Sequence, residues 1–278
     1  MMKRVLYSEL YRAFYSYGFL LSLALGLIIV IVHIIKSVVP TLEFVNDIFL
    51  YPDKAGNFPH TVFNKWLGGE LTGLYSHLYF LFIPLLAVLP YGDSYFMDRK
   101  TGYTKNILIR VKSSSYHSAK YIAVFLSGGA AVIIPLLVNL GISALLIPSV
   151  LPEVSTHTHA ITAVSMWSAL YYSHPYLYLA GYFGIIFLFS GLWATICLPV
   201  AFVGGNRFLV LLFPFLLYVF INSAADFFGF SALSPLHFLQ PSQSVVPANF
   251  VVILIETILL AAITFGIFTI KGPHDDTF

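Results

Sequence analysis

The sequence predicts an all-helical integral membrane protein with six transmembrane helices. Hydrophobic residues make up 59% of the 278-residue chain and charged residues only 9%, whereas a soluble globular chain carries about 25% charged residues. Long apolar runs alternate with polar segments, and each run approaches the roughly 20 residues that a helix needs to cross a bilayer. We expect one transmembrane domain over residues 1–278.

The apolar runs give the boundaries of the expected spans. Proline interrupts the second run at Pro84 and the third at Pro135, and helices within a membrane tolerate such breaks. The six expected spans are residues 18–38, 73–91, 121–147, 176–203, 208–228 and 249–270.

The positive charges predict the orientation of the chain. Lys and Arg gather in cytoplasmic loops, and with six spans only Lys36, Lys54 and Lys65 fall on the opposite side. Both termini are therefore expected in the cytoplasm. Before the last span, residues 229–248 are broken by prolines into pieces too short to cross, so we expect a re-entrant hairpin on the outer face, with an ordinary outer loop as the alternative.

Residues 3–17 have the period of an amphipathic helix. Arg4, Ser8, Arg12 and Ser16 recur every four residues and leave an apolar face opposite them. This pattern is typical of a helix lying in the membrane interface with its basic side towards the headgroups. A simple extension of the first span is the alternative.

The polar segment 95–120 carries six of the fourteen Lys and Arg residues of the chain. Over residues 98–111 its spacing predicts a short basic helix between the second and third spans. Such a helix on the cytoplasmic face suits the binding of a soluble partner. The same charges also suit a loop that only fixes topology and touches anionic lipid.

No motif of a known catalytic class is present, so we expect neither an enzyme nor catalytic residues. The chain has no Walker A pattern, no HExxH and no GxSxG, and its one cysteine is Cys197. His157 and His159 form an HxH pair, which is a weak signal, and we expect no metal site.

A few polar and aromatic residues within the spans are candidates for a substrate pathway. Ionisable groups inside a membrane are costly and often functional. Glu256 in the last span and Asp226 near the end of the fifth are the clearest, and an ion-coupled transporter or channel would use them. Asn222 is a neutral polar group at depth, and Tyr79 and Phe82 belong to an aromatic run that could line a cavity.

The order of these segments resembles the permease subunit of type-2 ABC exporters, the ABC-2 family. The resemblance covers the whole chain: an amphipathic helix, six spans, a basic helix between spans two and three, and a broken hairpin before the last. The local match starts at Asp98, passes through Gly102 and Thr104 and ends at Lys120, while Glu9 and Arg12 resemble the family's N-terminal helix. Asp98 replaces the usual Glu, Tyr103 intervenes between Gly102 and Thr104, and the proline that often follows the helix is absent.

The resemblance implies a separate ATPase chain that holds ATP and Mg²⁺ and docks on the cytoplasmic face. It also implies a second permease chain and no cofactor in this one. The cargo would be a hydrophobic or amphipathic molecule, a peptide or toxin before a drug, exported across a bacterial cell membrane by alternating access. The residues implied for ATPase coupling are Glu9, Arg12, Asp98, Arg99, Lys100, Gly102, Tyr103, Lys105, Asn106 and Arg110.

Overall fold

The computed structural model describes residues 2–42, 60–71, 73–154 and 159–275, with side chains as far as Gly272. Every regular element in this part of the chain is helical, as predicted. Five apolar stretches are long enough to cross a membrane: Tyr17–Leu42, Ser113–Leu146, Pro175–Val203, Arg207–Phe227 and Phe250–Gly272. They contain α2 (Tyr17–His33) with η1 (Ile34–Val38), α8 (Ser113–Leu146), α10 (Pro175–Ala194) with α11 (Cys197–Val203), α12 (Arg207–Phe227) and most of α14 (Phe250–Asp275).

The predicted second span, residues 73–91, is shorter than expected. Helix α5 runs over Leu74–Val88, which is 15 residues, or about 22 Å at 1.5 Å per residue. That length is less than the ~30 Å hydrocarbon core of a bilayer. The chain turns at residues 89–93 and then enters α6 (Ser94–Lys100). Within the described residues the structure thus has five long apolar helices and one short one, where the sequence predicted six spans.

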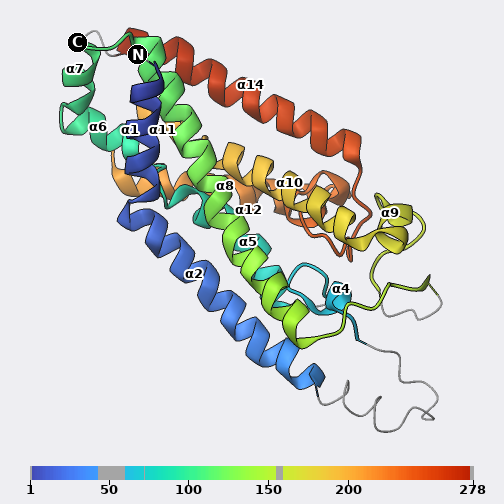
Figure 1. Cartoon of the computed structure of the whole chain (residues 1–278). Helices are drawn as coiled ribbons and strands as arrows, with labels where there is room; N and C mark the ends of the chain where they lie inside the picture. Colours follow the sequence, from blue (N-terminus) through green and yellow to red (C-terminus); the bar gives the residue numbers. More distant parts are fainter. Residues whose placement is uncertain (1, 43–59, 72, 155–158, 276–278) are drawn as a thin grey trace, which may run out of the picture.

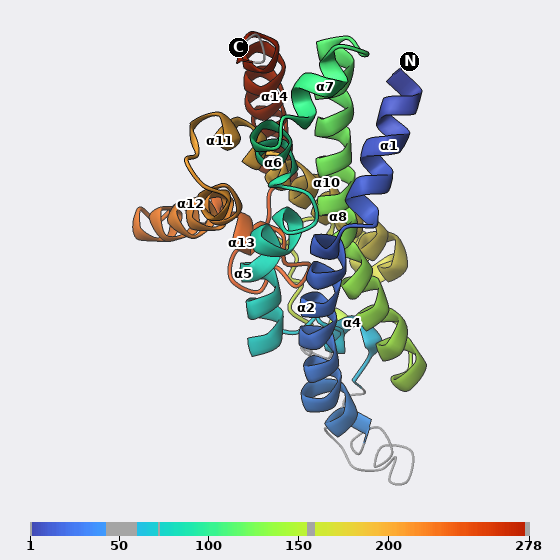
Figure 2. The same cartoon turned by 90° about the vertical axis from the view of Figure 1, so that its left-hand side faces the viewer.

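Helix α8 is the centre of the bundle. It is 34 residues long and packs against α2, α5, α10, α14 and α1 (Met2–Phe14). In Figures 1 and 2 it passes obliquely through the molecule with α2 beside it. Because α8 contacts these helices, a movement of α8 would also displace them.

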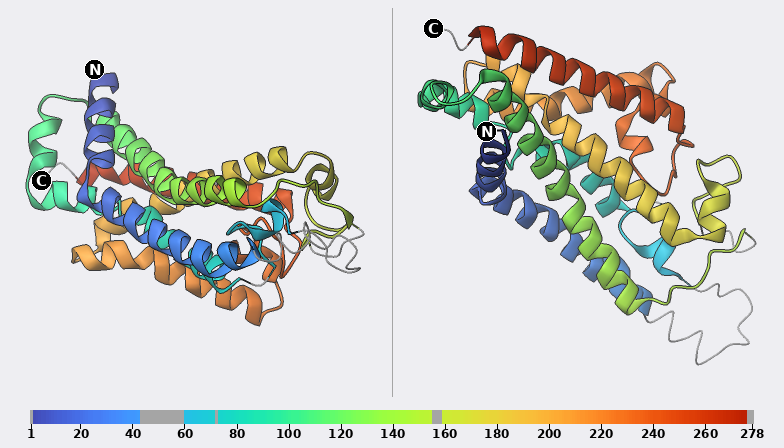
Figure 3. Two further views of the ribbon diagram at one scale, coloured as in Figure 1. Left: turned by 60° about the horizontal axis from the view of Figure 1, so that its bottom comes forward. Right: turned by 45° about the horizontal axis from the view of Figure 1, so that its top comes forward.

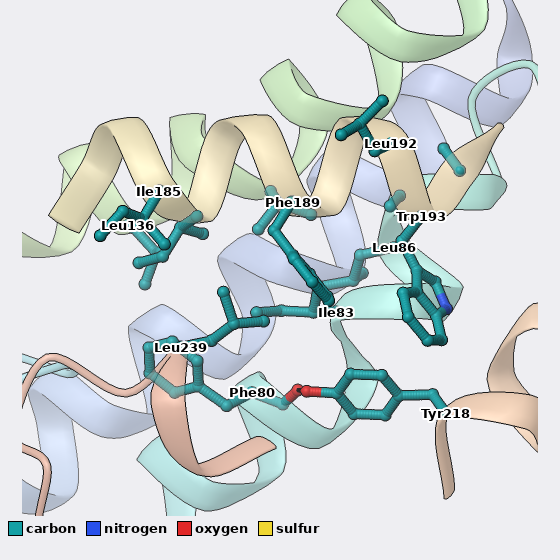
Figure 4. Close-up of a cluster of buried hydrophobic side chains, with 14 of the residues drawn as sticks. Phe80, Ile83, Leu86, Leu136, Ile185, Phe189, Leu192, Trp193, Tyr218 and Leu239 are labelled. Atoms are coloured by element: carbon teal, nitrogen blue, oxygen red, sulfur yellow. Dashed lines mark hydrogen bonds between the residues drawn. The ribbon is translucent and has the colours of Figure 1, made fainter. Parts of the chain in front are cut away.

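Aromatic side chains fill the space between α5, α10 and α12. Phe189 stacks on Trp193 with ring centroids 5.4 Å apart, and the Tyr218 hydroxyl donates to the Phe80 carbonyl over 3.2 Å. Figure 4 shows these rings beside Ile83 of α5. Helices in a membrane associate through close packing and interhelical hydrogen bonds, and much of the aromatic content serves that purpose here.

Different helices form the two ends of the bundle. In Figure 1 the start of α1, the C-terminal end of α14, α6 and α7 (Tyr103–Leu108) gather at one end, and Figure 2 agrees. Figures 1 and 3 place α4 (Val62–Lys65) and α9 (Ser168–Ser173) at the other. We call these the terminal end and the far end of the bundle.

The N-terminal helix differs from the prediction in its length and in its orientation. It ends at Phe14, and Ser16 accepts a hydrogen bond from the Phe19 backbone N–H to cap α2. The buried stripe is Val5, Glu9 and Ala13. Arg12 does not face outward with the other basic residues, because two carboxylates within the fold bind its guanidinium.

The predicted helix 98–111 is instead two short helices, α6 and α7. Gly102 separates them with φ of 76°, a left-handed conformation that costs other residues about 1–2 kcal/mol. The third span also begins earlier than predicted, because α8 starts at Ser113. Lys120, at the end of the predicted polar segment, is therefore inside this long helix.

The stretch 229–248 forms short, mostly buried pieces, as its prolines predicted. They are η3 (Ser231–Leu233) and α13 (Pro235–Phe238), followed by turns. Gln243 holds these turns in place: its amide bonds the Met166 backbone N–H (2.8 Å) and carbonyl (3.0 Å) and donates to the Tyr178 hydroxyl over 2.9 Å.

Candidate functional site

A buried network of charges joins α1, α6 and α8 near the terminal end. Lys120 Nζ lies 2.5 Å from Glu9 Oε2 and 2.6 Å from Asp98 Oδ2. The side chains of Lys120 and Glu9 are 0% exposed and that of Asp98 is 4% exposed. Glu9 lies 89 positions before Asp98 in the sequence, and Lys120 lies 22 positions after it, so only the tertiary fold brings the three together.

Arg12 closes the network from the half-exposed side. Its guanidinium contacts Glu9 Oε1 at 3.0 Å and donates to Asp98 Oδ1 at 2.6 Å and Oδ2 at 3.2 Å. It also lies over the Tyr103 ring, 4.4 Å from the centroid, where a cation is attracted by the ring electrons. Two cations and two carboxylates thus balance one another.

Two tyrosine hydroxyls complete the hydrogen bonding of the carboxylates. Tyr91 donates to Glu9 Oε2 over 2.8 Å and accepts from Lys120 over 3.2 Å. Tyr116 donates to Asp98 Oδ2 over 2.9 Å. Burial, together with the neighbouring Glu9 carboxylate, raises the pKa of Tyr91, so its hydroxyl stays protonated and can donate.

The network also determines the ionisation of its outer members. Burial alone would raise the pKa of Asp98, but the charge of Lys120 and the hydrogen bonds from Arg12 and Lys120 outweigh it, and the pKa is lowered. Burial alone would lower the pKa of Arg12, but its hydrogen bond to Asp98 and the nearby negative charges raise it. Both groups are therefore charged near neutral pH.

Simple helical spacing brings these residues to facing surfaces. Glu9 lies on the buried stripe of α1 that packs against α8, and Arg12 is one turn away at i+3. Tyr116 and Lys120 are four residues apart on α8, so they share one face. Asp98 lies on the buried side of α6. The network is therefore a joint among three helices.

The residues expected to couple to an ATPase divide between the interior and the surface. Lys100, Lys105, Asn106 and Arg110 are exposed on α6, on α7 and just beyond. Arg99 is half-buried and donates to the Ala201 carbonyl at 3.3 Å. In contrast, Asp98 and Glu9 point inward, where a partner protein would not reach their side chains.

The expected pathway residues have separate structural partners. Buried Tyr79 donates to the Val132 carbonyl over 2.6 Å, and Phe82 stacks on Phe215 with centroids 5.9 Å apart. Asn222 accepts from Ser234 over 2.5 Å and from the Leu236 backbone N–H over 3.1 Å.

The two acidic pathway candidates also differ from each other. Asp226 lies 3.0 Å from His237 Nε2. Glu256 is half-buried, and no described residue forms a hydrogen bond or an ion pair with it. Within the described residues, no hydrogen bond or ion pair joins any two of Tyr79, Phe82, Asn222, Asp226 and Glu256.

The HxH pair of the sequence is described only in part. His159 contacts the Tyr171 hydroxyl over 2.8 Å, and burial lowers the pKa of its imidazole. His157 lies outside the described residues. The described residues contain no group of three metal-ligating side chains.

Sequence reasoning placed Lys120 only as a family-like position and missed Tyr91 and Tyr116. A signal was available: Lys120 lies directly before the apolar core of the third span, where an unpaired cation is costly. The sequence alone does not show which carboxylates neutralise it.

No family model matches the chain, and comparisons with curated proteins and with solved structures give no match. The length and hydropathy of its helices make this chain a helical, multi-pass membrane protein.

Proposed function

We propose that this chain is the transmembrane subunit of an ATP-driven ABC exporter whose ATPase is a separate protein. One observation carries the proposal. The α6–α7 segment has an exposed basic surface on one side, and on the other side Asp98 ties it to Lys120 of α8 and Arg12 of α1.

This arrangement suits the transmission of force. Separating Asp98 from Lys120 would remove one partner of each buried charge, and breaking a buried pair costs about 3–5 kcal/mol. A push on α6 is therefore expected to move α1 and α8 with it. Because α8 packs against α2, α5 and α10, the movement would spread through the bundle, as a rigid-body transition requires.

The remaining parts of the proposal concern partners, cargo and place. The ATPase would bind ATP and Mg²⁺ and dock on the cytoplasmic surface formed by Lys100, Lys105, Asn106 and Arg110. A second permease chain, a copy or a relative, would complete the pathway. An aromatic bundle with few charges suits a hydrophobic or amphipathic cargo, a peptide or toxin before a drug, moved out of a bacterial cell by alternating access.

Co-purification with a candidate ATPase tests the docking surface. The double variant Lys105→Glu with Arg110→Glu reverses two exposed charges and should weaken ATPase binding about tenfold or more, because like charges would now oppose complementary acidic residues. The matched control is Lys36→Glu with Lys65→Glu, which makes the same net change elsewhere. Equal binding by both variants would contradict the docking role.

An ion-coupled transporter or channel is the second candidate, because Glu256 lies in a span without a described partner. The two functions are separated by measuring flux in vesicles that contain this chain alone and in vesicles that contain it together with a candidate ATPase and ATP. Flux that follows an ion gradient without ATP, and that is abolished by Glu256→Gln, would favour this candidate. Flux only with an ATPase and ATP would favour the exporter.

A further inference from the structure

Two cavities meet at Glu70, between α4 and the start of α5. The first, about 300 Å³, is lined in part by Ser37, His60, Lys65 and Tyr75. The second, about 400 Å³, is lined in part by Ser76, Gln240, Ser244 and Val245. Glu70, Leu71, Gly73 and Leu74 line both. These cavities share no residue with the charge network at Lys120.

A chain of hydrogen bonds orients the groups behind Glu70. The Leu67 backbone N–H donates to Asn139 Oδ1 over 2.7 Å, so the Asn139 amide nitrogen points the other way, 3.0 Å from His33 Nδ1. An amide nitrogen is a donor, so Nδ1 must accept. The proton of His33 is therefore on Nε2, which lies 3.2 Å from Glu70 Oε1.

His33 is 0% exposed, so Asn139 and not water determines the orientation of its ring. Its Nε2 lies near Glu70 Oε1 but forms no hydrogen bond. The imidazole therefore closes off the inner side of the Glu70 carboxylate.

The second oxygen of Glu70 has no partner. Glu70 Oε2 is buried and forms no hydrogen bond, while the side chain as a whole is 11% exposed. It lies against Gly73, where a Cβ atom would overlap it. Gly73 is the N-cap of α5, and the positive end of the helix dipole favours a negative charge there. A buried carboxylate oxygen without a donor is costly, and a cation at the exposed part of the same carboxylate would offset that cost.

The two cavities differ in the charge that they would accept. In the first, Lys65 stands near His60, whose pKa is lowered by burial and by the charge of Lys65. A second cation would be repelled there. The described lining of the second cavity contains no Lys or Arg: it has the carboxyl group of Glu70 and the imidazole of His77, and Leu71, Leu74 and Val245 supply apolar surface.

We propose that the second cavity binds the primary ammonium group of an amphipathic amine. The ammonium pairs with the Glu70 carboxylate, whose side chain is 11% exposed, and the apolar part of the ligand lies along Leu71, Leu74 and Val245. A volume of about 400 Å³ is within the usual range of small-molecule sites. The ligand is either a soluble amine, such as a peptide N-terminus, or the headgroup of phosphatidylethanolamine. This site is independent of any ATPase.

Equilibrium dialysis tests the proposal with 2-phenylethylammonium as the probe. The full chain is placed in phosphatidylcholine nanodiscs, and empty nanodiscs correct for partition into lipid. We expect saturable binding of the amine and at least tenfold weaker binding of the neutral analogue 2-phenylethanol, because a hydrogen bond to a charged group is lost. Absence of saturable binding, or equal binding of both compounds, would overturn the proposal.

Variants locate the site. Glu70→Gln should weaken amine binding at least tenfold and leave 2-phenylethanol unchanged, while Glu153→Gln, which removes an exposed acid, should change neither. Gly73→Ala keeps the charge but displaces the carboxylate, so it should also weaken binding, and it serves if Glu70→Gln does not fold. Wild-type affinity in a folded Glu70→Gln or Gly73→Ala chain would refute the assignment.

The source of the ammonium is determined by repeating the dialysis in nanodiscs that contain phosphatidylethanolamine. A loss of probe affinity in these nanodiscs identifies the lipid headgroup as the ligand, because it competes for Glu70. Unchanged affinity identifies a soluble amine. Both results support the ammonium site and differ only in what occupies it.

Discussion

The substitution Lys120→Met removes the cation at the centre of the buried network and keeps most of the side-chain length. Glu9 and Asp98, which now lie 2.5 and 2.6 Å from Lys120 Nζ, would be left with Arg12 as their charged partner. The network would change from balanced to a net charge of −1 in a site from which water is excluded.

The expected loss follows from what each carboxylate retains. Removing one partner of a buried ion pair costs about 3–5 kcal/mol. Asp98 keeps Arg12 at 2.6 Å and Tyr116 at 2.9 Å, and Glu9 keeps Tyr91 at 2.8 Å. Because these bonds compensate in part, we expect the lower end, about 3 kcal/mol, which is on the order of a hundredfold in the unfolding equilibrium.

The assay is equilibrium unfolding in mixed micelles by titration with a denaturing detergent. Lys105→Met is the matched control, because Lys105 is exposed on α7 and its loss should change the free energy of unfolding by less than about 0.5 kcal/mol. The double variant Lys120→Met with Asp98→Asn should be less destabilised than the sum of the single variants, since both partners of one pair are then neutral.

A loss below 1 kcal/mol for Lys120→Met, or one equal to that of Lys105→Met, would refute the reasoning that the network holds the three helices together. Additive effects in the double variant would show that Lys120 and Asp98 do not interact energetically.

Two further predictions concern the same segment. The pKa of Asp98 is lowered in the folded chain, so its stabilising contribution is present above the ordinary carboxyl pKa and should be lost as the pH falls through the lower folded value. Comparing the acid-unfolding midpoint of Asp98→Asn with that of wild type measures this loss. Identical pH profiles of the two proteins would contradict the prediction. Gly102 has φ of 76° with open space around it, so Gly102→Ala should lower the free energy of unfolding by about 1–2 kcal/mol through the backbone alone. The control is Gly205→Ala, which is also in open space but lacks the positive φ, and it should cost less in thermal unfolding. Equal effects of the two substitutions would count against backbone strain at Gly102.

The sequence was sufficient for the features that depend on local composition and period. Apolar runs predicted where the long helices lie, because a span must satisfy its own backbone and expose apolar side chains along its length. The prolines of 229–248 predicted short pieces, whereas the predicted helix 98–111 ran through Gly102, which in the structure is a left-handed residue between α6 and α7.

Other features required the third dimension, because their partners are far apart in the sequence. Helical period assigned Arg12 to an outward basic face, yet Asp98, 86 residues away, binds it within the fold. The length of α5 was overestimated because residues 89–91, Leu-Pro-Tyr, extend the apolar run although they already belong to the turn.

The amino-acid sequence by itself therefore determined that this protein is a bundle of membrane-crossing helices with a basic segment at one end. Only the tertiary structure decided that Glu9, Asp98 and Lys120 neutralise one another, and that Asn139, His33 and Glu70 lie next to one another. The physical reason is that a buried charge can be accommodated only by a partner of suitable geometry, and the identity of that partner depends on how helices from distant parts of the chain pack together.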